Sequence, residues 1–210
     1  MQALPTIAAM HLYATLPVYS PAPSVSTPRL RAQDSGSPRV SVHVAASAQD
    51  QAACRALVCR VYAERGYLTQ AVDAALDQTH TVVLGAWVGH HLAATLTIRR
   101  DSAAGLLADT LYPEEMHYLR SAGESVCEFS RLAVDPQFSS RAVLEALFSR
   151  SYDYAHAVFG CSDAVIEVNP RHAGFYSRRF GYARIGDEKL CPRVDAPAVL
   201  MHRRREDAPR

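Results

Sequence analysis

An acid, a hydroxyl and an arginine interrupt an apolar run in the middle of the chain. Residues 126 to 134 read VCEFSRLAV, so Glu128, Ser130 and Arg131 stand among side chains that favour a central strand. Burying a charge is costly unless it meets an opposite charge, a hydrogen-bond partner or a ligand. The segment therefore predicts either an internal ion pair between Glu128 and Arg131 or a site where these groups meet a ligand.

The alternation of side chains along a strand limits how these groups can act together. Successive residues point to opposite faces of a sheet, which places Glu128 and Ser130 on one face and Arg131 on the other. A β-bulge shifts this alternation by one residue. A bulge near Arg131 is therefore expected if the acid and the arginine serve one site.

A second polar segment, residues 169 to 182, reads NPRHAGFYSRRFGY and follows the apolar run DAVIEV. Pro170 suits the first turn of a helix and Gly181 suits its end, so a strand-to-helix junction is predicted here. The phenylalanines and the last tyrosine are expected in the core. Tyr176 fits either the core or a chemical role.

The remaining hydrophobic pattern predicts the element order β, α, β, β, β, α, β, α, β, which is a mixed sheet covered by helices. A loop with one helical turn near residues 113 to 119 is expected between residues 101 and 124. The predicted strands span residues 40–44, 81–87, 91–98, 126–134, 163–168 and 194–201, and the predicted helices span residues 50–65, 139–159 and 170–180.

Length and composition indicate one globular domain with a tail. The chain has 210 residues, of which 49% are hydrophobic and 20% are charged. Half of the 12 prolines lie before residue 40, among serines and threonines without apolar periodicity. We therefore predict a disordered tail over residues 1–38, a folded domain over residues 39–203 and a charged tail over residues 204–210.

Charge, cysteines and motifs exclude several classes of function. A net charge of +1 gives no field that would attract nucleic acid or an anionic membrane, and no segment predicts a membrane span. Five cysteines without a C-x-x-C pair indicate reduced core thiols in a cytoplasmic protein. The phosphate-loop, dinucleotide, HExxH and GxSxG motifs are absent, and His90 and His91 would point to opposite faces of a strand, so no metal site is predicted.

The second polar segment resembles the last αβ unit of the GNAT acyltransferase superfamily, with its pattern N-x-x-x-A-x-F-Y-x-x-x-F-G-Y. The predicted strand order matches that superfamily as well. The resemblance implies an α/β fold with a central mixed, mostly antiparallel, splayed sheet flanked by helices. It also implies that Tyr176 protonates a leaving thiolate and that Asn169 holds a pantetheine arm.

The first segment is similar to a strand shared by acyl-homoserine-lactone synthases and long-chain N-acyl amino acid synthases, E-x-S-R-[FL]-A-V-D. Residues 59–64, CRVYAE, resemble the first helix of both families, and residues 191–201 resemble the amino acid synthases specifically. The lactone synthases carry a tryptophan and a tight cluster of acids after that helix, where this chain has Tyr67, Asp73 and Asp77. The amino acid synthases are therefore preferred.

Three alternatives stay open. The chain could be a lactone synthase, an acyltransferase of the kind associated with bacterial surface-protein sorting, or a non-catalytic module that binds acyl chains or a carrier protein. The non-catalytic reading is disfavoured because Glu128 and Tyr176 are both present.

The resemblance also bears on the acyl donor. Acyltransferases of this superfamily that use coenzyme A usually have the loop Q/R-x-x-G-x-G/A, whereas residues 137–142 read QFSSRA, without glycine. We therefore expect acyl-phosphopantetheine of acyl carrier protein as donor in preference to acyl-CoA, and no tightly bound cofactor. The implied protein is a cytoplasmic bacterial enzyme whose partners are acyl carrier protein and an amino acid.

The implied reaction joins a fatty acyl group to the α-amine of that amino acid. Glu128 would act as the base, a backbone N–H freed by the bulge would stabilise the oxyanion, and Ser130 and Arg131 would bind the amino acid. Because carrier proteins are acidic, a basic patch is expected at the pantetheine entrance, and its candidates are Arg171, Arg178 and Arg179.

Overall fold

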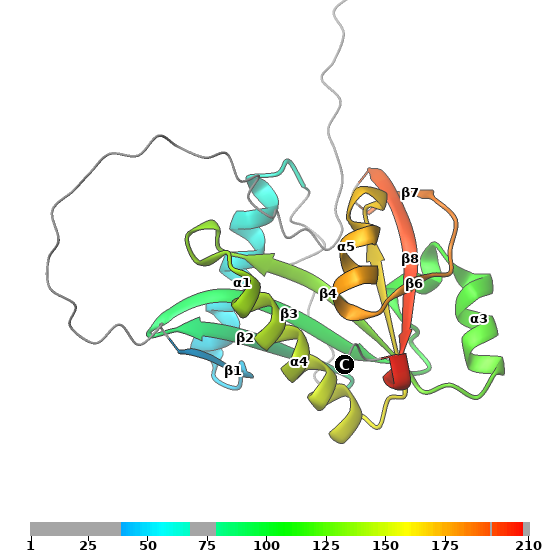
Figure 1. The fold of residues 1–210 in the computed structure, drawn as a ribbon, viewed down its shortest axis with the longest axis horizontal. Helices are drawn as coiled ribbons and strands as arrows, with labels where there is room; N and C mark the ends of the chain where they lie inside the picture. The colour runs from blue at the N-terminus through cyan, green and yellow to red at the C-terminus, as the bar shows by residue number, and fades with distance from the viewer. Residues whose placement is uncertain (1–38, 68–78, 194, 208–210) are drawn as a thin grey trace, which may run out of the picture.

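The computed structural model describes residues 39–67, 79–193 and 195–207, which fold around an eight-stranded sheet (Figure 1). The strands follow the order β1-β2-β3-β4-β5-β8-β6, and β7 pairs with β8 outside this row. Their bounds are β1 Val40–Val44, β2 Thr81–Val88, β3 His91–Arg100, β4 Val126–Val134, β5 Asp163–Val168, β6 Ala183–Arg184, β7 Lys189–Cys191 and β8 Ala196–Arg204.

The sheet is mixed and mostly antiparallel, as expected. Within the described residues, β4 and β5 are parallel and every other paired set of strands is antiparallel. A parallel pair needs a crossover connection, and the helix α4 (Arg141–Ala157) supplies it. The helix α5 (Pro170–Phe180) follows β5 and leads to β6, β7 and β8.

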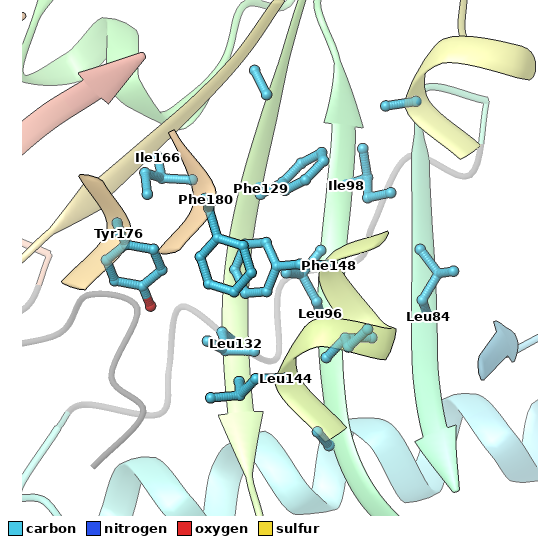
Figure 2. Close-up of a cluster of buried hydrophobic side chains, with 14 of the residues drawn as sticks. Leu84, Leu96, Ile98, Phe129, Leu132, Leu144, Phe148, Ile166, Tyr176 and Phe180 are labelled. Carbon is cyan, nitrogen blue, oxygen red and sulfur yellow. The ribbon is translucent and has the colours of Figure 1, made fainter. Parts of the chain in front are cut away.

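Helices cover both faces of the sheet. In Figure 1, α4 and α5 lie in front of it, whereas α1 (Ala48–Ala63) lies behind. The front face holds the main core, in which Phe148 of α4 stacks on Phe180 of α5 at 4.2 Å between ring centroids. Figure 2 shows these rings beside Phe129 of β4 and Tyr176 of α5. The back face packs against α1 and, further along, α3 (Pro113–Ser121).

Local sequence explains where the helices begin and end. Ser47 caps α1 by accepting the Asp50 N–H at 3.0 Å, and Ser140 does the same for α4 with Val143. Gly181 ends α5 in the left-handed conformation with φ 74°, which glycine adopts without a steric penalty.

The 3₁₀ turn η1 (Leu107–Thr110) is fixed by a charged side-chain network. Arg120 of α3 donates to Asp109 at 2.6 Å and to Asp101 at 2.6 Å. Asp109 in turn accepts the Leu106 N–H at 2.7 Å. These contacts hold the backbone of Leu107 against the sheet, next to β4.

Most predicted elements are confirmed, with three differences. The segment expected to be mainly loop, residues 101–124, contains both η1 and α3, while β6 and β7 are too short to show an alternating pattern in the sequence. β8 continues to Arg204 and is followed by the 3₁₀ turn η3 (Arg205–Asp207), so ordered structure extends past the predicted domain end at residue 203. The predicted tail over residues 1–38 lies outside the described residues.

All five cysteines are free thiols, and four of them are buried. In the part of the chain that the structure describes, the helices are too short or too polar to cross a membrane.

Candidate active site

The strands β4 and β5 are paired over three residues only. Val126 to Glu128 pair with Asp163 to Val165, but the rest of β4 and β5 are not paired with each other. β5 stays paired with β8 along its whole length, whereas β4 stays with β3. The two halves of the sheet therefore splay apart, and Glu128 lies where the separation begins.

The Glu128 carboxyl is almost fully buried, with 2% of the residue exposed. Its Oε2 accepts the Leu107 N–H at 2.6 Å. Burial raises its pKa to about 8, the nearby Glu167 adds to this rise, and the Leu107 N–H, Arg193 and Arg99 oppose it. A carboxyl with this pKa can accept and return a proton near neutral pH.

Two further charged residues, which the sequence interpretation missed, complete this cluster. Glu167 of β5 is 8% exposed and forms an ion pair with Arg193, whose Nη1 donates to the Leu107 carbonyl at 3.0 Å. Burial raises the Glu167 pKa, and Arg193 lowers it in part. An available signal was the acid Glu167 inside the apolar run DAVIEV, which was interpreted as a buried strand only.

The bulge expected near Arg131 is present. Two residues of β4 lie opposite one residue of β3, and Arg131 is one of the two, with a positive φ of 52°. Before the bulge Phe129 faces the main core, and after it Leu132 and Val134 do, so the alternation shifts by one residue. Arg131 instead approaches Tyr62 of α1, on the same face as Glu128.

Glu128 and Arg131 form no ion pair with each other, although both lie in the described part of the chain. The internal pair that the sequence left open is therefore absent. Burial lowers the pKa of Arg131, and the positive charges of Arg99 and Arg55 act in the same direction. Its neighbour Ser130 is half-buried and lies opposite Thr97 of β3.

Tyr176 is buried, with 1% exposed, at the edge of the aromatic core. In Figure 2 the Tyr176 ring lies to the left of the Phe180 ring, and its hydroxyl points downward in the view. Burial raises its pKa, and Tyr62 of α1 raises it further. The hydroxyls of Tyr176 and Tyr62, which belong to helices on opposite faces of the sheet, thus interact electrostatically. With its raised pKa, Tyr176 stays protonated at neutral pH.

The structure places Asn169 at the start of α5, where its side chain accepts the Arg171 N–H at 3.1 Å. This contact is a helix cap. His172, in the same turn, has its pKa lowered to about 4 by burial and by the charges of Arg171 and Arg65. Arg65, which follows α1, and Arg171, in the first turn of α5, therefore both lie within electrostatic range of His172.

The three arginines proposed as carrier-protein contacts are spread along α5. Arg171 is in the first turn of α5, whereas Arg178 and Arg179 are in the last turn, about 10 Å further along the helix axis. Arg179 is also engaged in an ion pair with Glu145 of α4.

Comparisons with known proteins agree with this geometry. Residues 53–204 match the family sequence model of the N-acyl amino acid synthase FeeM. The solved structure of FeeM, an N-acyl amino acid synthase from uncultured soil microbes, superposes with a TM-score of 0.72 at 26% identity, covering 80% of this chain and 93% of that one. No curated protein sequence matches significantly.

More distant structures share the fold. An acyl-CoA N-acyltransferase from Pseudomonas aeruginosa superposes with a TM-score of 0.55 at 17% identity, covering 79% of this chain and 98% of that one. Arabidopsis thaliana NAA60, solved in complex with acetyl-CoA, gives a TM-score of 0.57 at 12% identity, covering 80% and 99%. The expected GNAT architecture is therefore confirmed.

Proposed function

The chain belongs to the FeeM family of N-acyl amino acid synthases, and from this membership we propose that it transfers a long-chain fatty acyl group from acyl carrier protein to the α-amine of an amino acid. The fold is that of a GNAT acyltransferase. The observation that carries the proposal is the buried carboxyl of Glu128 at the point where β4 and β5 separate.

In the proposed reaction the amine nitrogen attacks the thioester carbonyl carbon. The C–N bond forms, the C–S bond breaks, and the ammonium proton must leave before attack because the protonated amine has no lone pair. Glu128 takes this proton, since its raised pKa brings its basicity close to that of an amine. Glu167 raises the pKa of Glu128 and Arg193 lowers it, and the two residues form an ion pair with each other.

Arg131 binds the carboxylate of the amino acid in this proposal, with Ser130 beside it. A guanidinium makes two parallel hydrogen bonds to a carboxylate, and the bulge turns Arg131 onto the face that holds Glu128. A backbone N–H released from the β3–β4 ladder by the bulge donates to the oxyanion of the tetrahedral intermediate.

Tyr176 protonates the departing thiolate. Its raised pKa keeps the hydroxyl protonated, and its position at the separated strands suits a group that meets the pantetheine sulfur. Asn169 contributes by fixing the first turn of α5, on which the route of the pantetheine arm depends.

The start of α4 supports acyl carrier protein as the donor. Asp135 accepts the Gln137 N–H at 2.9 Å and Ser140 accepts the Val143 N–H at 3.3 Å, so the protein's own side chains use N–H groups that a pyrophosphate would need. The Asp135 carboxylate also disfavours a phosphate there, although Arg60 pairs with it at 2.7 Å.

For the carrier protein itself we propose a basic contact at the splayed end, made by Arg171 with Arg65. Arg178 lies further along α5, and the ion pair of Arg179 with Glu145 makes it the weakest of the predicted contacts. The five free thiols are consistent with work in a reducing cytoplasm.

A competition between donors tests this function. Purified protein is given one fatty acyl group either on acyl carrier protein or on coenzyme A, with a mixture of amino acids as acceptors. The proposal expects a kcat/KM at least tenfold higher for the carrier protein. An equal or higher value for the coenzyme A thioester would contradict the donor assignment.

A further inference from the structure

A hollow of about 860 Å³ lies between the second half of α4, the end of α5 and the end of β8. Its charged lining consists of Arg150, Arg179, Arg203 and Arg205, with Glu145 and Asp153. The volume falls within the range of small-molecule sites, about 300–1,000 Å³, and exceeds what a single oxyanion needs. Glu128 does not line it.

The lining carries an excess of positive charge. Four arginines face two acids, and one of these acids, Glu145, is already shared by Arg179 and Arg141. Arg150 and Arg205 lie exposed at the rim. Cations that converge from four separate elements on one concave surface favour an anionic ligand.

Arg203 at the floor of the hollow is the most informative residue. It follows Val199 and Met201 at the alternate positions of β8 that face the main core, and it is only 7% exposed. Within the described residues its guanidinium has no acidic partner, and its Nε is buried without a hydrogen bond. A buried arginine normally has an acidic partner and a hydrogen bond for each N–H group, because desolvating its charge is costly.

The contact of Arg203 with an aromatic ring offsets only part of the cost of desolvating its charge. Its guanidinium carbon lies 3.7 Å from the centroid of the Tyr152 ring, which attracts the cation but accepts no conventional hydrogen bond. The Tyr152 hydroxyl is buried beside Arg203 and interacts with both Arg203 and Tyr182. The same wall therefore presents one buried charged group, the Arg203 Nε, without a hydrogen bond.

The hollow is separate from the proposed acyl-transfer site. Arg203 aligns with Ala164, which pairs with Cys127 in the part of β4 and β5 that remains joined. Glu128 is one residue further along β4, and its side chain points to the other face of the sheet, where it binds Leu107. The two sites thus lie on opposite faces of the sheet, and a ligand in one need not touch a ligand in the other.

We propose that this hollow binds a small organic anion that carries at least two phosphate or carboxylate groups. Arg203 supplies the buried contact, and Arg150 and Arg205 bind the second group at the rim. Guanidinium groups bind both kinds of oxyanion in the same forked geometry, so the shared chemistry is that of a multivalent oxyanion. This inference does not depend on the proposed function.

Binding to the full chain tests the proposal without any measurement of turnover. Calorimetry and thermal unfolding would be recorded with pyrophosphate as the phosphate probe and citrate as the carboxylate probe, each against sodium chloride at equal ionic strength. We expect saturable binding of at least one probe, with a rise in Tm that sodium chloride does not produce. The probe that binds more tightly identifies the class of acidic group.

Variants assign the binding to the hollow. Arg203→Met keeps the apolar contact with Tyr152 and should lower the affinity for the probe by about tenfold or more, since a charged hydrogen bond is lost. Arg150→Gln and Arg205→Gln change exposed residues, so their folding is secure, and each should weaken it several-fold. Arg39→Gln, which removes an exposed arginine outside the hollow, should leave the affinity unchanged.

Two results would overturn the proposal. If neither probe binds beyond the effect of salt, water satisfies the polar groups of the hollow. If binding persists unchanged in Arg150→Gln and Arg205→Gln, the anion binds elsewhere, even where Arg203→Met fails to fold.

Discussion

Glu128 and Arg193 both bind Leu107: the carboxyl accepts its N–H at 2.6 Å, and the guanidinium donates to its carbonyl at 3.0 Å. Arg193 also pairs with Glu167, so one backbone residue links the two acids to their common cation. The base proposed for the reaction is thereby held by three elements that are distant in sequence: β4, η1 and the segment before β8.

Replacing Glu128 by glutamine should remove the base and keep the fold. The amide oxygen of glutamine can still accept the Leu107 N–H, and the cost of a buried acid disappears. Loss of a general base lowers rates by roughly 100- to 10,000-fold, so kcat should fall within that range. Steady-state kinetics with a thermal unfolding control would check this, and near-normal turnover would remove Glu128 from the mechanism.

The raised pKa of Glu128 also predicts a dependence of stability on pH. Its pKa is about 8 in the folded protein, against 4.5 for the free group, so the folded state holds a proton that the unfolded state releases. Its contribution to the free energy of unfolding is present below about pH 4.5 and is lost as the pH rises through about 8. Denaturant titrations of wild type and Glu128→Gln should diverge in this window, with wild type losing stability relative to the variant. Parallel curves would show that Glu128 titrates normally.

Glu167→Gln should shift the proton equilibrium of Glu128. Removing the Glu167 charge takes away one cause of the raised pKa, so the Glu128 pKa should move down and the acidic limb of the rate profile with it. Carbon NMR of the carboxyl groups and a pH–rate profile would measure the shift. Glu64→Gln, which changes an exposed acid of the helical C-cap after α1, is the matched control and should leave both unchanged.

Arg131→Lys tests the assignment of the amino acid carboxylate. Lysine keeps the positive charge but cannot make the paired hydrogen bonds of a guanidinium. The KM for the amino acid should rise by about tenfold or more, while the KM for the acyl donor stays within about twofold. An equal rise of both constants would favour a structural role for Arg131 in the bulge.

Salt and charge reversal test the carrier-protein contact. Acyl transfer from acyl carrier protein should slow as ionic strength rises, and transfer from a small acyl thioester should slow much less, because only the protein donor is steered by charge. Arg171→Glu should reproduce the effect at low salt, and Arg39→Glu should not. An identical salt dependence for the two donors would argue against a basic docking contact.

The sequence predicts much of the fold because its signals are local. Alternating valines, the stripe that runs from Cys54 to Tyr62, and the Pro170 to Gly181 frame each indicate one element without reference to the rest. The bulge at Arg131 was predictable for a related reason, since an acid and an arginine on opposite faces of a strand cannot serve one site without it. The short strands β6 and β7 carry no such pattern and depend on pairing with β8.

The site was only partly predictable because its remaining members depend on tertiary contacts. Glu167 and Arg193 meet only when β5 and the segment before β8 pack together, and no spacing between them indicates this. Asn169 matched a family motif, but its side-chain hydrogen bond to the Arg171 N–H becomes apparent only from the backbone of α5. The grouping of Arg171 with Arg178 and Arg179 as carrier-protein contacts stays a prediction, since it depends on a partner protein.

The identity of the product tests the central claim most directly. Purified protein would be incubated with acyl carrier protein bearing one fatty acyl group and with isotopically labelled amino acids, and the extract analysed by mass spectrometry. We predict an amide whose mass equals the fatty acid plus one amino acid less one water, with the label retained and the amine nitrogen acylated. A lactone product, or carrier protein that stays acylated with every amino acid supplied, would contradict the account.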